Sequence, residues 1–230
     1  MSSENKDYWD RNISEWGKFY LGTSHSNESL YGPKLLVKVY RSSIGRHEAK
    51  LMNKRFNETI NLLDSMVKPG VIVADIGCGT GIFTVEILRR GGTVIAVDIS
   101  ESSLSATREA IERLVPTAMD RVSYLQGDVE DLRLMKCDLI LAVGVAPYLK
   151  DIVGFVRSSL KQSDAIYISL LDRRHWANKI RRYIPQLNVR RLQMADLAAC
   201  EDAYREVGFN LESRVKLGTG VLDFVLRNRS

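Results

Sequence analysis

The sequence lacks the features of membrane, disulfide-rich and metal-binding proteins. Its three cysteines lie far apart with no C-x-x-C pair, so their spacing predicts neither a disulfide framework nor a zinc site. The longest nearly apolar run, Leu139 to Leu149, is much shorter than the roughly 20 residues of a membrane-spanning helix. The polar first residues, MSSENKDYWDRN, contain no apolar segment of a signal peptide. We therefore expect a globular protein of the reducing cytoplasm, without a bound metal.

What the sequence does contain is a regular alternation of apolar runs and amphipathic stretches. The expected strands are 71–75, 93–98, 122–126, 137–143 and 165–171, and the expected helices include 102–115 and 151–160. Strands that are apolar on both faces and alternate with helices indicate a parallel sheet covered on both sides.

The end of the chain breaks this alternation. A helix expected over 196–207 stops at Gly208, a favourable residue after a helix C-terminus. Two strands then follow, separated only by Thr219-Gly220, and this spacing predicts a β-hairpin. The sheet should therefore have six or seven strands, parallel until a terminal antiparallel pair.

A glycine-rich turn follows the first expected strand. In VADIGCGTGIFT, residues 73–84, Gly77, Gly79 and Gly81 leave the backbone open to a ligand at the carboxyl edge of the sheet. The third glycine comes one residue too early for the dinucleotide fingerprint G-x-G-x-x-G, and Asp75 lies two residues before the first glycine. Because a nearby carboxylate disfavours a pyrophosphate, the loop favours a ligand with a cationic end, such as S-adenosylmethionine.

Acidic residues also follow the next two strands. Asp98 can accept hydrogen bonds from both hydroxyls of a ribose, and Asp128 can accept one from an adenine amine. After the fourth strand, the small residues of LAVGVAPYL leave room for a methionine arm and a methyl acceptor. A single aspartate at a strand end is often a helix cap, but the ordered set favours a cofactor site.

These motifs resemble those of the class I S-adenosylmethionine-dependent methyltransferases that act on small molecules. ADIGCGTG is similar to the first motif of that family, VIAVDIS to the second, LQGDVEDL to the adenine loop and CDLILAVGV to the fourth-strand motif. The resemblance covers roughly residues 56 to 228 and implies a Rossmann-like α/β fold. Its seven-stranded, mostly parallel sheet would have an antiparallel last strand and helices on both faces. The cofactor-binding residues implied by the resemblance are Asp75, Gly77, Cys78, Gly79, Gly81, Asp98, Ile99, Asp128, Val129 and Val143.

The acceptor is less clearly marked. The sequence GVAPYL has one proline and no amide where amide and adenine N-methyltransferases carry [DNS]-P-P-[YF]. The segment after the fifth strand has a layout similar to glycan and magnesium-protoporphyrin O-methyltransferases, yet Tyr148 falls where the protoporphyrin enzymes carry a histidine. These features favour transfer to a hydroxyl or carboxylate oxygen, for example of a sugar or glycan-related metabolite, and leave the methylated atom open.

Transfer to a hydroxyl requires a general base. Of the three histidines, His175 follows the fifth strand and is the expected base, although an exposed position in a basic loop is an equally good interpretation. Tyr148 is the alternative catalytic or acceptor-positioning residue.

The first 55 residues precede the cofactor motifs. Their aromatic residues, which include Tyr20, recur at helical intervals. We expect residues 1–55 to form a helical lid that binds substrate through Tyr20, and residues 56–230 to form the cofactor-binding domain, although such a stripe can also be simple packing.

Positive charge is concentrated in one segment. The net charge is +5, and residues 173–191 contain six arginines and one lysine without an acidic residue. We expect Arg173, Arg174, Arg181 and Arg182 to bind a small anionic acceptor. Nucleic acid, a membrane-linked glycan or a protein remain alternative partners, as does a non-catalytic cofactor-binding role, and the sequence leaves the oligomeric state open.

Overall fold

The structure is a computed structural model that describes residues 34–183 and 192–227, with side chains from residue 50 to 180 and from 192 to 227. Most of the expected lid, including Tyr20 and its aromatic neighbours, lies outside the described residues, as do the side chains of Arg181 and Arg182.

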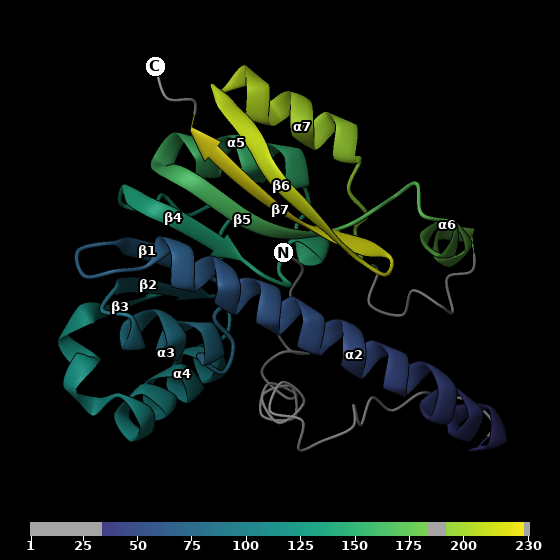
Figure 1. The fold of residues 1–230 in the computed structure, drawn as a ribbon, viewed down its shortest axis with the longest axis horizontal. Helices are drawn as coiled ribbons and strands as arrows, with labels where there is room; N and C mark the ends of the chain where they lie inside the picture. The colour runs from purple at the N-terminus through teal and green to yellow at the C-terminus, as the bar shows by residue number, and fades with distance from the viewer. Residues whose placement is uncertain (1–33, 184–191, 228–230) are drawn as a thin grey trace.

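One seven-stranded sheet forms the centre of the molecule, in the order β3-β2-β1-β4-β5-β7-β6 (Figure 1). The strands are β1 (Ile72–Ile76), β2 (Thr93–Asp98), β3 (Val122–Gln126), β4 (Cys137–Ala142), β5 (Ser163–Leu171), β6 (Phe209–Leu217) and β7 (Gly220–Arg227). β1 to β5 are parallel, and β7 is inserted antiparallel between β5 and β6. The predicted mostly parallel sheet with an antiparallel last strand is therefore confirmed.

The terminal hairpin is also present, with its turn one residue earlier than expected. Leu217 pairs with Gly220, so the two turn residues are Gly218 and Thr219, and not Thr219 and Gly220. Gly218 has a φ of +56°, a conformation that a glycine adopts without steric cost. This position explains why the turn starts there.

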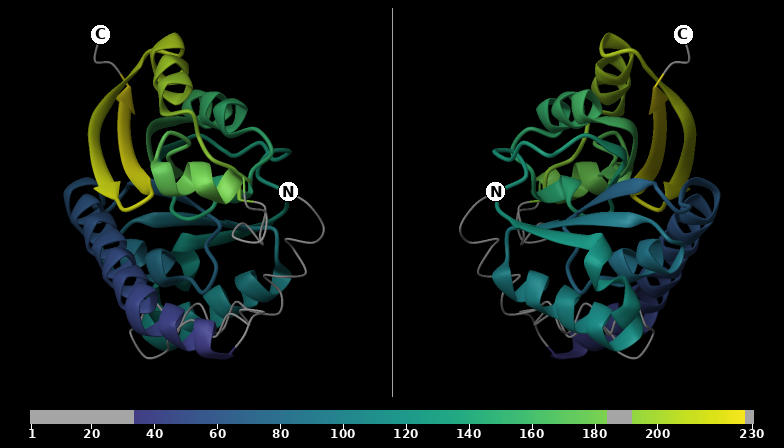
Figure 2. Two further views of the ribbon diagram at one scale, coloured as in Figure 1. Left: turned by 90° about the vertical axis from the view of Figure 1, so that its right-hand side faces the viewer. Right: turned by 90° about the vertical axis from the view of Figure 1, so that its left-hand side faces the viewer.

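Helices cover both faces of the sheet (Figure 2). The helices are α2 (Lys34–Met66), α3 (Ile82–Arg89), α4 (Glu101–Leu114), α5 (Ile152–Gln162), α6 (Trp176–Tyr183) and α7 (Leu197–Glu206), with 3-10 turns η1 (Pro116–Arg121) and η2 (Ala146–Tyr148). One buried cluster joins α2, α3 and α4 to the sheet, and a second joins α5 and α7 to its other face. Successive residues of β1, such as Val73 and Ala74, belong to opposite clusters, as expected for a strand buried on both sides.

Helix α2 leads into the first strand. Its apolar stripe, which includes Phe56, Ile60 and Leu63, packs on the core. The boundary expected between residues 55 and 56 lies inside this continuous helix, so the division into lid and domain stays a prediction. Among the described residues, none of the helices combines the length and hydropathy required to cross a membrane.

Candidate functional site

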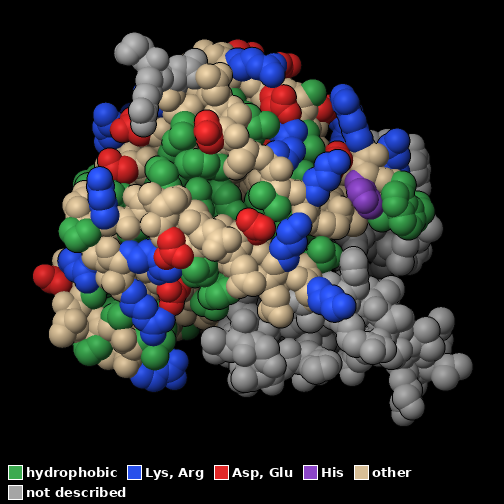
Figure 3. All heavy atoms as spheres, in the orientation of Figure 1, with side chains coloured by type: hydrophobic (Ala, Val, Ile, Leu, Met, Phe, Trp, Pro, Cys, Tyr) green, Lys and Arg blue, Asp and Glu red, His purple; other side chains and the backbone are tan. Residues whose placement is uncertain are grey.

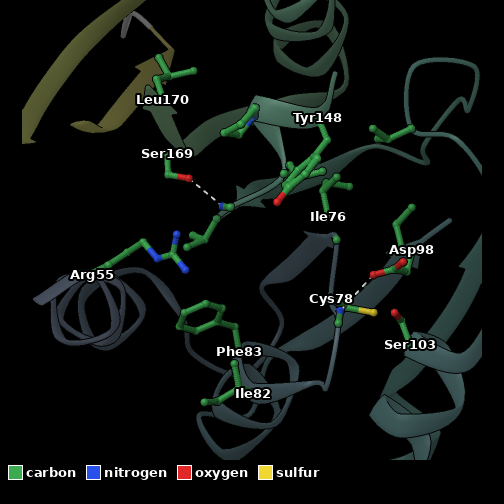
Figure 4. A pocket seen from close by; sticks show the side chains of 18 of the residues that line it. Arg55, Ile76, Cys78, Ile82, Phe83, Asp98, Ser103, Tyr148, Ser169 and Leu170 are labelled. Carbon is green, nitrogen blue, oxygen red and sulfur yellow. Dashed lines mark hydrogen bonds between the residues drawn. The ribbon is translucent and has the colours of Figure 1, made fainter. Parts of the chain in front are cut away.

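A cavity of about 330 Å³ opens at the carboxyl ends of β1, β2, β4 and β5 (Figure 4). The glycine-rich loop, Asp98 and Asp128 form one side of it, and α2, η2 and the β6–β7 hairpin contribute to the other. The cavity therefore lies where open parallel sheets bind their ligands.

The glycine-rich loop connects β1 to α3. The N–H groups of Gly77 and Cys78 donate to the carbonyl of Val97 at 2.8 and 3.1 Å, which fixes the loop to the end of β2. Gly77 has a φ of +69°, and a Cβ atom built on it would lie 3.3 Å from Cβ of Val145. A side chain at this position would thus be strained and would crowd the cavity wall.

The expected cofactor residues divide into two groups. Most of them line the cavity, and two lie behind it. Those on the lining are Gly77, Cys78, Gly79, Asp98, Ile99, Asp128, Val129 and Val143. Gly81 faces α4 instead, because a Cβ atom built on it would lie 3.0 Å from Thr107.

Asp98 connects the end of β2 to the loop. Its two carboxylate oxygens accept hydrogen bonds from the N–H groups of Gly79 at 3.1 Å and Ser100 at 2.9 Å. Burial raises the pKa of Asp98 above its usual value, and these backbone hydrogen bonds oppose that rise. Asp98 also lines the cavity, and a carboxylate can accept several hydrogen bonds at once.

Asp75 lies behind the loop and does not line the cavity. Its side chain is 2% exposed, and one oxygen accepts a 2.6 Å hydrogen bond from the Thr84 hydroxyl. Burial raises its pKa from 3.8 to about 6, and the Thr84 hydrogen bond opposes this rise. The structure therefore does not bring Asp75 into contact with the space that a ligand would occupy.

Arg55 is a cavity residue that the sequence analysis missed. It projects from α2 toward the cavity (Figure 4), and a Cβ atom built on Gly144 would lie 3.6 Å from its Nη1. Burial lowers the pKa of Arg55 to about 10, and the Tyr148 phenol opposes this shift. Arg55 lies four residues after Leu51 and four before the buried Thr59, so all three share the inward face of the helix. This spacing is the feature of the sequence that could have indicated that Arg55 faces inward.

Tyr148 lines the acceptor side of the cavity, as expected, together with Ser169 at the end of β5. Its phenol oxygen points toward the centre of the cavity (Figure 4). The hydroxyl of Ser169 accepts a 2.7 Å hydrogen bond from the N–H of Gly144, which connects the ends of β4 and β5. The remaining wall is mostly apolar, with Leu51, Met52, Leu170, Leu171 and Val221 among its residues.

His175 does not reach the cavity. Its Nδ1 accepts a 3.3 Å hydrogen bond from the N–H of Ala177, and its ring lies 5.9 Å from that of Trp176. The imidazole therefore caps the start of α6, and the structure gives no support to its expected role as general base.

Arg173 and Arg174 also lie outside the lining. Both are exposed, and they approach Asp196 at 3.4 and 3.8 Å. Their backbone belongs to the surface segment that leads into α6, and their expected role in binding an acceptor stays a prediction. No group of three potential metal ligands occurs among residues 34–183 and 192–227.

Comparison with known proteins finds similarity over the segment that contains the glycine-rich loop, Asp98 and Asp128. A family model described as "Methyltransferase domain" matches residues 73–161. The chain is 40% identical over 81 residues to a magnesium-protoporphyrin O-methyltransferase of Rhodobacter capsulatus, covering 35% of each chain. It is 35% identical over 109 residues to a ribosomal protein L11 methyltransferase of Acetivibrio thermocellus, covering 47% of this chain and 34% of the relative. The chain thus spans about a third of the length of these curated relatives.

The likeness to solved structures covers nearly the whole chain. A magnesium protoporphyrin IX methyltransferase from Synechocystis, solved with S-adenosylhomocysteine, superposes with a TM-score of 0.76 at 16% identity. The superposition covers 98% of this chain and 99% of the other. At this identity the likeness shows the fold.

Proposed function

We propose that this chain, which belongs by fold to the class I S-adenosylmethionine-dependent methyltransferases, transfers a methyl group to an oxygen of a small acceptor with an apolar body. The observation that carries the proposal is the division of one cavity into two unlike halves. The glycine-rich loop, Asp98 and Asp128 form the half suited to the cofactor, and an apolar wall around Tyr148 forms the other.

The cofactor half fits S-adenosylmethionine group by group. Asp98, which lines the cavity at the end of β2, would accept the two ribose hydroxyls. Asp128 would accept the adenine amine, with Val129 against the ring, and the loop backbone would face the methionyl end. These assignments follow from where each residue lies on the lining.

Arg55 would hold the methionyl carboxylate. It is the only lysine or arginine among the described residues that line the cavity, and Asp75 does not reach the same space. A guanidinium in an apolar setting forms strong, charge-assisted hydrogen bonds with a carboxylate. The lowered pKa of Arg55 reflects the desolvation that such a carboxylate would offset.

The acceptor half differs from our expectation of an arginine-lined pocket for an anionic acceptor. Arg173 and Arg174 lie outside it, and its wall carries leucines, Met52 and Val221. An acceptor with an apolar body would fill this space by hydrophobic contact. Its polar group would meet the hydroxyls of Tyr148 and Ser169 near the boundary between the two halves.

A carboxylate oxygen fits this arrangement as the methyl acceptor. When bound, S-adenosylmethionine supplies an activated methyl group, whose carbon–sulfur bond breaks as the new carbon–oxygen bond forms and S-adenosylhomocysteine leaves. A carboxylate is already ionised at neutral pH, so no general base is required, in keeping with the position of His175 outside the lining. The chain would act chiefly by holding the oxygen in line with the methyl group.

A protein acceptor is the second candidate, because ribosomal protein L11 methyltransferases are among the similar proteins. The same experiment separates the two. The purified chain is incubated with S-adenosylmethionine and either a panel of aromatic and aliphatic carboxylic acids or purified ribosomal protein L11. S-adenosylhomocysteine, methyl esters and methylated protein are then measured by mass spectrometry. Ester formation with apolar acids supports the proposal. Formation of methylated L11 alone, or cofactor binding without any turnover, contradicts it.

A further inference from the structure

Helix α6 carries an apolar face that is exposed in the part of the chain that the structure describes. Trp176 is 69% exposed and Ile180 is 41% exposed, and residues four apart lie on the same side of a helix. Figure 3 shows an apolar projection at the position of α6, with lysine and arginine side chains around it. Two large apolar side chains exposed side by side mark a contact surface more often than an isolated one does.

The opposite side of α6 is fixed to the fold. Asn178 is fully buried, and its amide donates to the carbonyls of Asp172 at 2.8 Å and Thr219 at 2.7 Å. These bonds hold the helix against the end of β5 and the β6–β7 turn. The exposed face of Trp176 and Ile180 is therefore presented outward by a fixed anchor.

Cations flank this apolar face. Lys179 is exposed beside Ile180, and Arg173 and Arg174 precede the helix with side chains that are 52% and 72% exposed. Asp196 approaches both arginines, at 3.4 and 3.8 Å. Ion pairs this long and this exposed contribute little, so the arginines remain available to an anionic surface.

We propose that Arg173, Arg174, Trp176, Lys179 and Ile180 form a docking surface for an anionic lipid bilayer. An amphipathic helix with tryptophan and an aliphatic residue on one face and cations beside them is suited to lie at the boundary between headgroups and acyl chains. Anionic headgroups attract the flanking cations, each of which strengthens binding about fivefold. Tryptophan itself favours this interfacial depth.

The docking surface lies next to the mouth of the cavity. Leu171 and Leu192, at the two ends of the segment that contains α6, both line the cavity, and the segment is bonded to the η2 turn through the N–H of Gln193 and the carbonyl of Pro147 at 2.7 Å. Docking would thus bring the apolar half of the cavity close to the bilayer. In this respect the inference rests on the proposed function: the acceptor would be an amphiphile taken from the membrane.

Vesicle binding tests the surface without any cofactor or acceptor, so its outcome is independent of methyl transfer. The full chain is sedimented with vesicles of phosphatidylcholine alone or mixed with phosphatidylglycerol. We expect binding to the mixed vesicles only, and a loss of at least about tenfold in W176S/I180S and in R173Q/R174Q/K179Q. The charge variant should also lose most of its salt dependence.

Matched controls come from the amino ends of β4 and β5, whereas α6 follows the carboxyl end of β5. Met135 is 71% exposed, so M135S removes a comparable apolar side chain. The variant K136Q/K161Q removes two exposed cations. Both control variants should bind vesicles as the unaltered chain does. In a W9F/W16F background, Trp176 is the single tryptophan, and its emission should shift to the blue when vesicles are added. Absence of binding to anionic vesicles, equal binding by W176S/I180S, or tighter binding to unrelated RNA than to vesicles would overturn the inference.

Discussion

The two halves of the cavity are built in different ways. The cofactor half is made from residues at the carboxyl ends of β1, β2 and β3 or just after them. Each of these residues is therefore positioned by its own strand. The acceptor half combines Met52 from α2, Tyr148 from η2, Ser169 from β5 and Val221 from β7, which are far apart in the sequence. The first half is thus determined by local order in a parallel sheet, and the second by long-range packing.

The largest expected effect is on the packing that supports the acceptor half. Asp223 is fully buried and lies opposite Arg214 in the hairpin, with two hydrogen bonds of 2.7 Å from the guanidinium and one of 3.1 Å from Tyr204. D223A would leave Arg214 without its main partner, and we expect it to lower the free energy of unfolding by about 3–5 kcal/mol. Urea denaturation measures this change.

A second ion pair, which joins β7 of the hairpin to the neighbouring strand β5, provides the control. Asp164 and Arg227 are 3.0 Å apart, and both side chains are nearly half exposed, so D164N should cost less than about 1 kcal/mol. Equal losses of unfolding free energy in D223A and D164N would show that burial of the Asp223–Arg214 pair does not increase its contribution to stability. They would also show that this pair does not specifically stabilise the acceptor wall.

The next effect concerns the cofactor half. D98A removes a carboxylate that orders Gly79 and Ser100 and that we expect to accept two ribose hydroxyls. Each hydrogen bond to a charged group contributes about 1.5–3 kcal/mol, so affinity for S-adenosylmethionine should fall at least about tenfold in calorimetry. D131N, at an exposed acid near the adenine loop, should bind normally. An unchanged affinity in folded D98A would contradict the placement of the ribose.

Sequence order was sufficient to predict the fold and the lining of the cofactor half. The acids at strand ends and the glycines after β1 occur in a fixed order, and a parallel sheet brings its carboxyl ends to one edge. The position of Asp75 could not be predicted, because a strand-terminal acid can face the ligand or lie behind the loop. Its burial and its hydrogen bond from Thr84 place it behind the loop, and its role in cofactor binding stays a prediction. Arg55 was missed because an arginine in a charged helix usually faces solvent, and its burial depends on how α2 packs across the sheet.

A substitution at Arg55 tests the residue that links the two halves. R55Q should weaken S-adenosylmethionine binding by about 1.5–3 kcal/mol, because the methionyl carboxylate loses its cation. Decarboxylated S-adenosylmethionine should bind R55Q and the unaltered chain equally well. The control is K54Q, at the adjacent residue, whose exposed ammonium donates to the carbonyl of Lys216 at 3.2 Å. If R55Q still bound S-adenosylmethionine more tightly than the decarboxylated form, by the same factor as the unaltered chain, Arg55 would contact the acceptor and not the methionyl carboxylate.

The buried carboxyl of Asp75 predicts a dependence of stability on pH. Its pKa is raised from 3.8 to about 6 in the folded protein, so between these values the native state binds more protons than the unfolded state. Its contribution to stability therefore falls as pH rises through this window. D75N should flatten that fall by about 1–3 kcal/mol, measured by urea denaturation at pH 4.5 and pH 7 (roughly the two ends of the window). A steeper fall in D75N would contradict the burial, and a loss of cofactor affinity as large as that of D98A would restore Asp75 to the binding site.

The smallest expected effect distinguishes a positioning residue from a base at the boundary between the halves. Y148F keeps the ring in the wall and removes the phenol oxygen that points into the cavity. If that hydroxyl only orients the acceptor, its loss removes one neutral hydrogen bond, about 0.5–1.5 kcal/mol. The acceptor's kcat/KM should then fall only a few-fold, with cofactor affinity unchanged and no change in the shape of the pH profile. General base catalysis contributes roughly 10²–10⁴-fold, so a fall of that size, with an altered pH profile, would identify Tyr148 as the base and exclude a carboxylate as the methylated group.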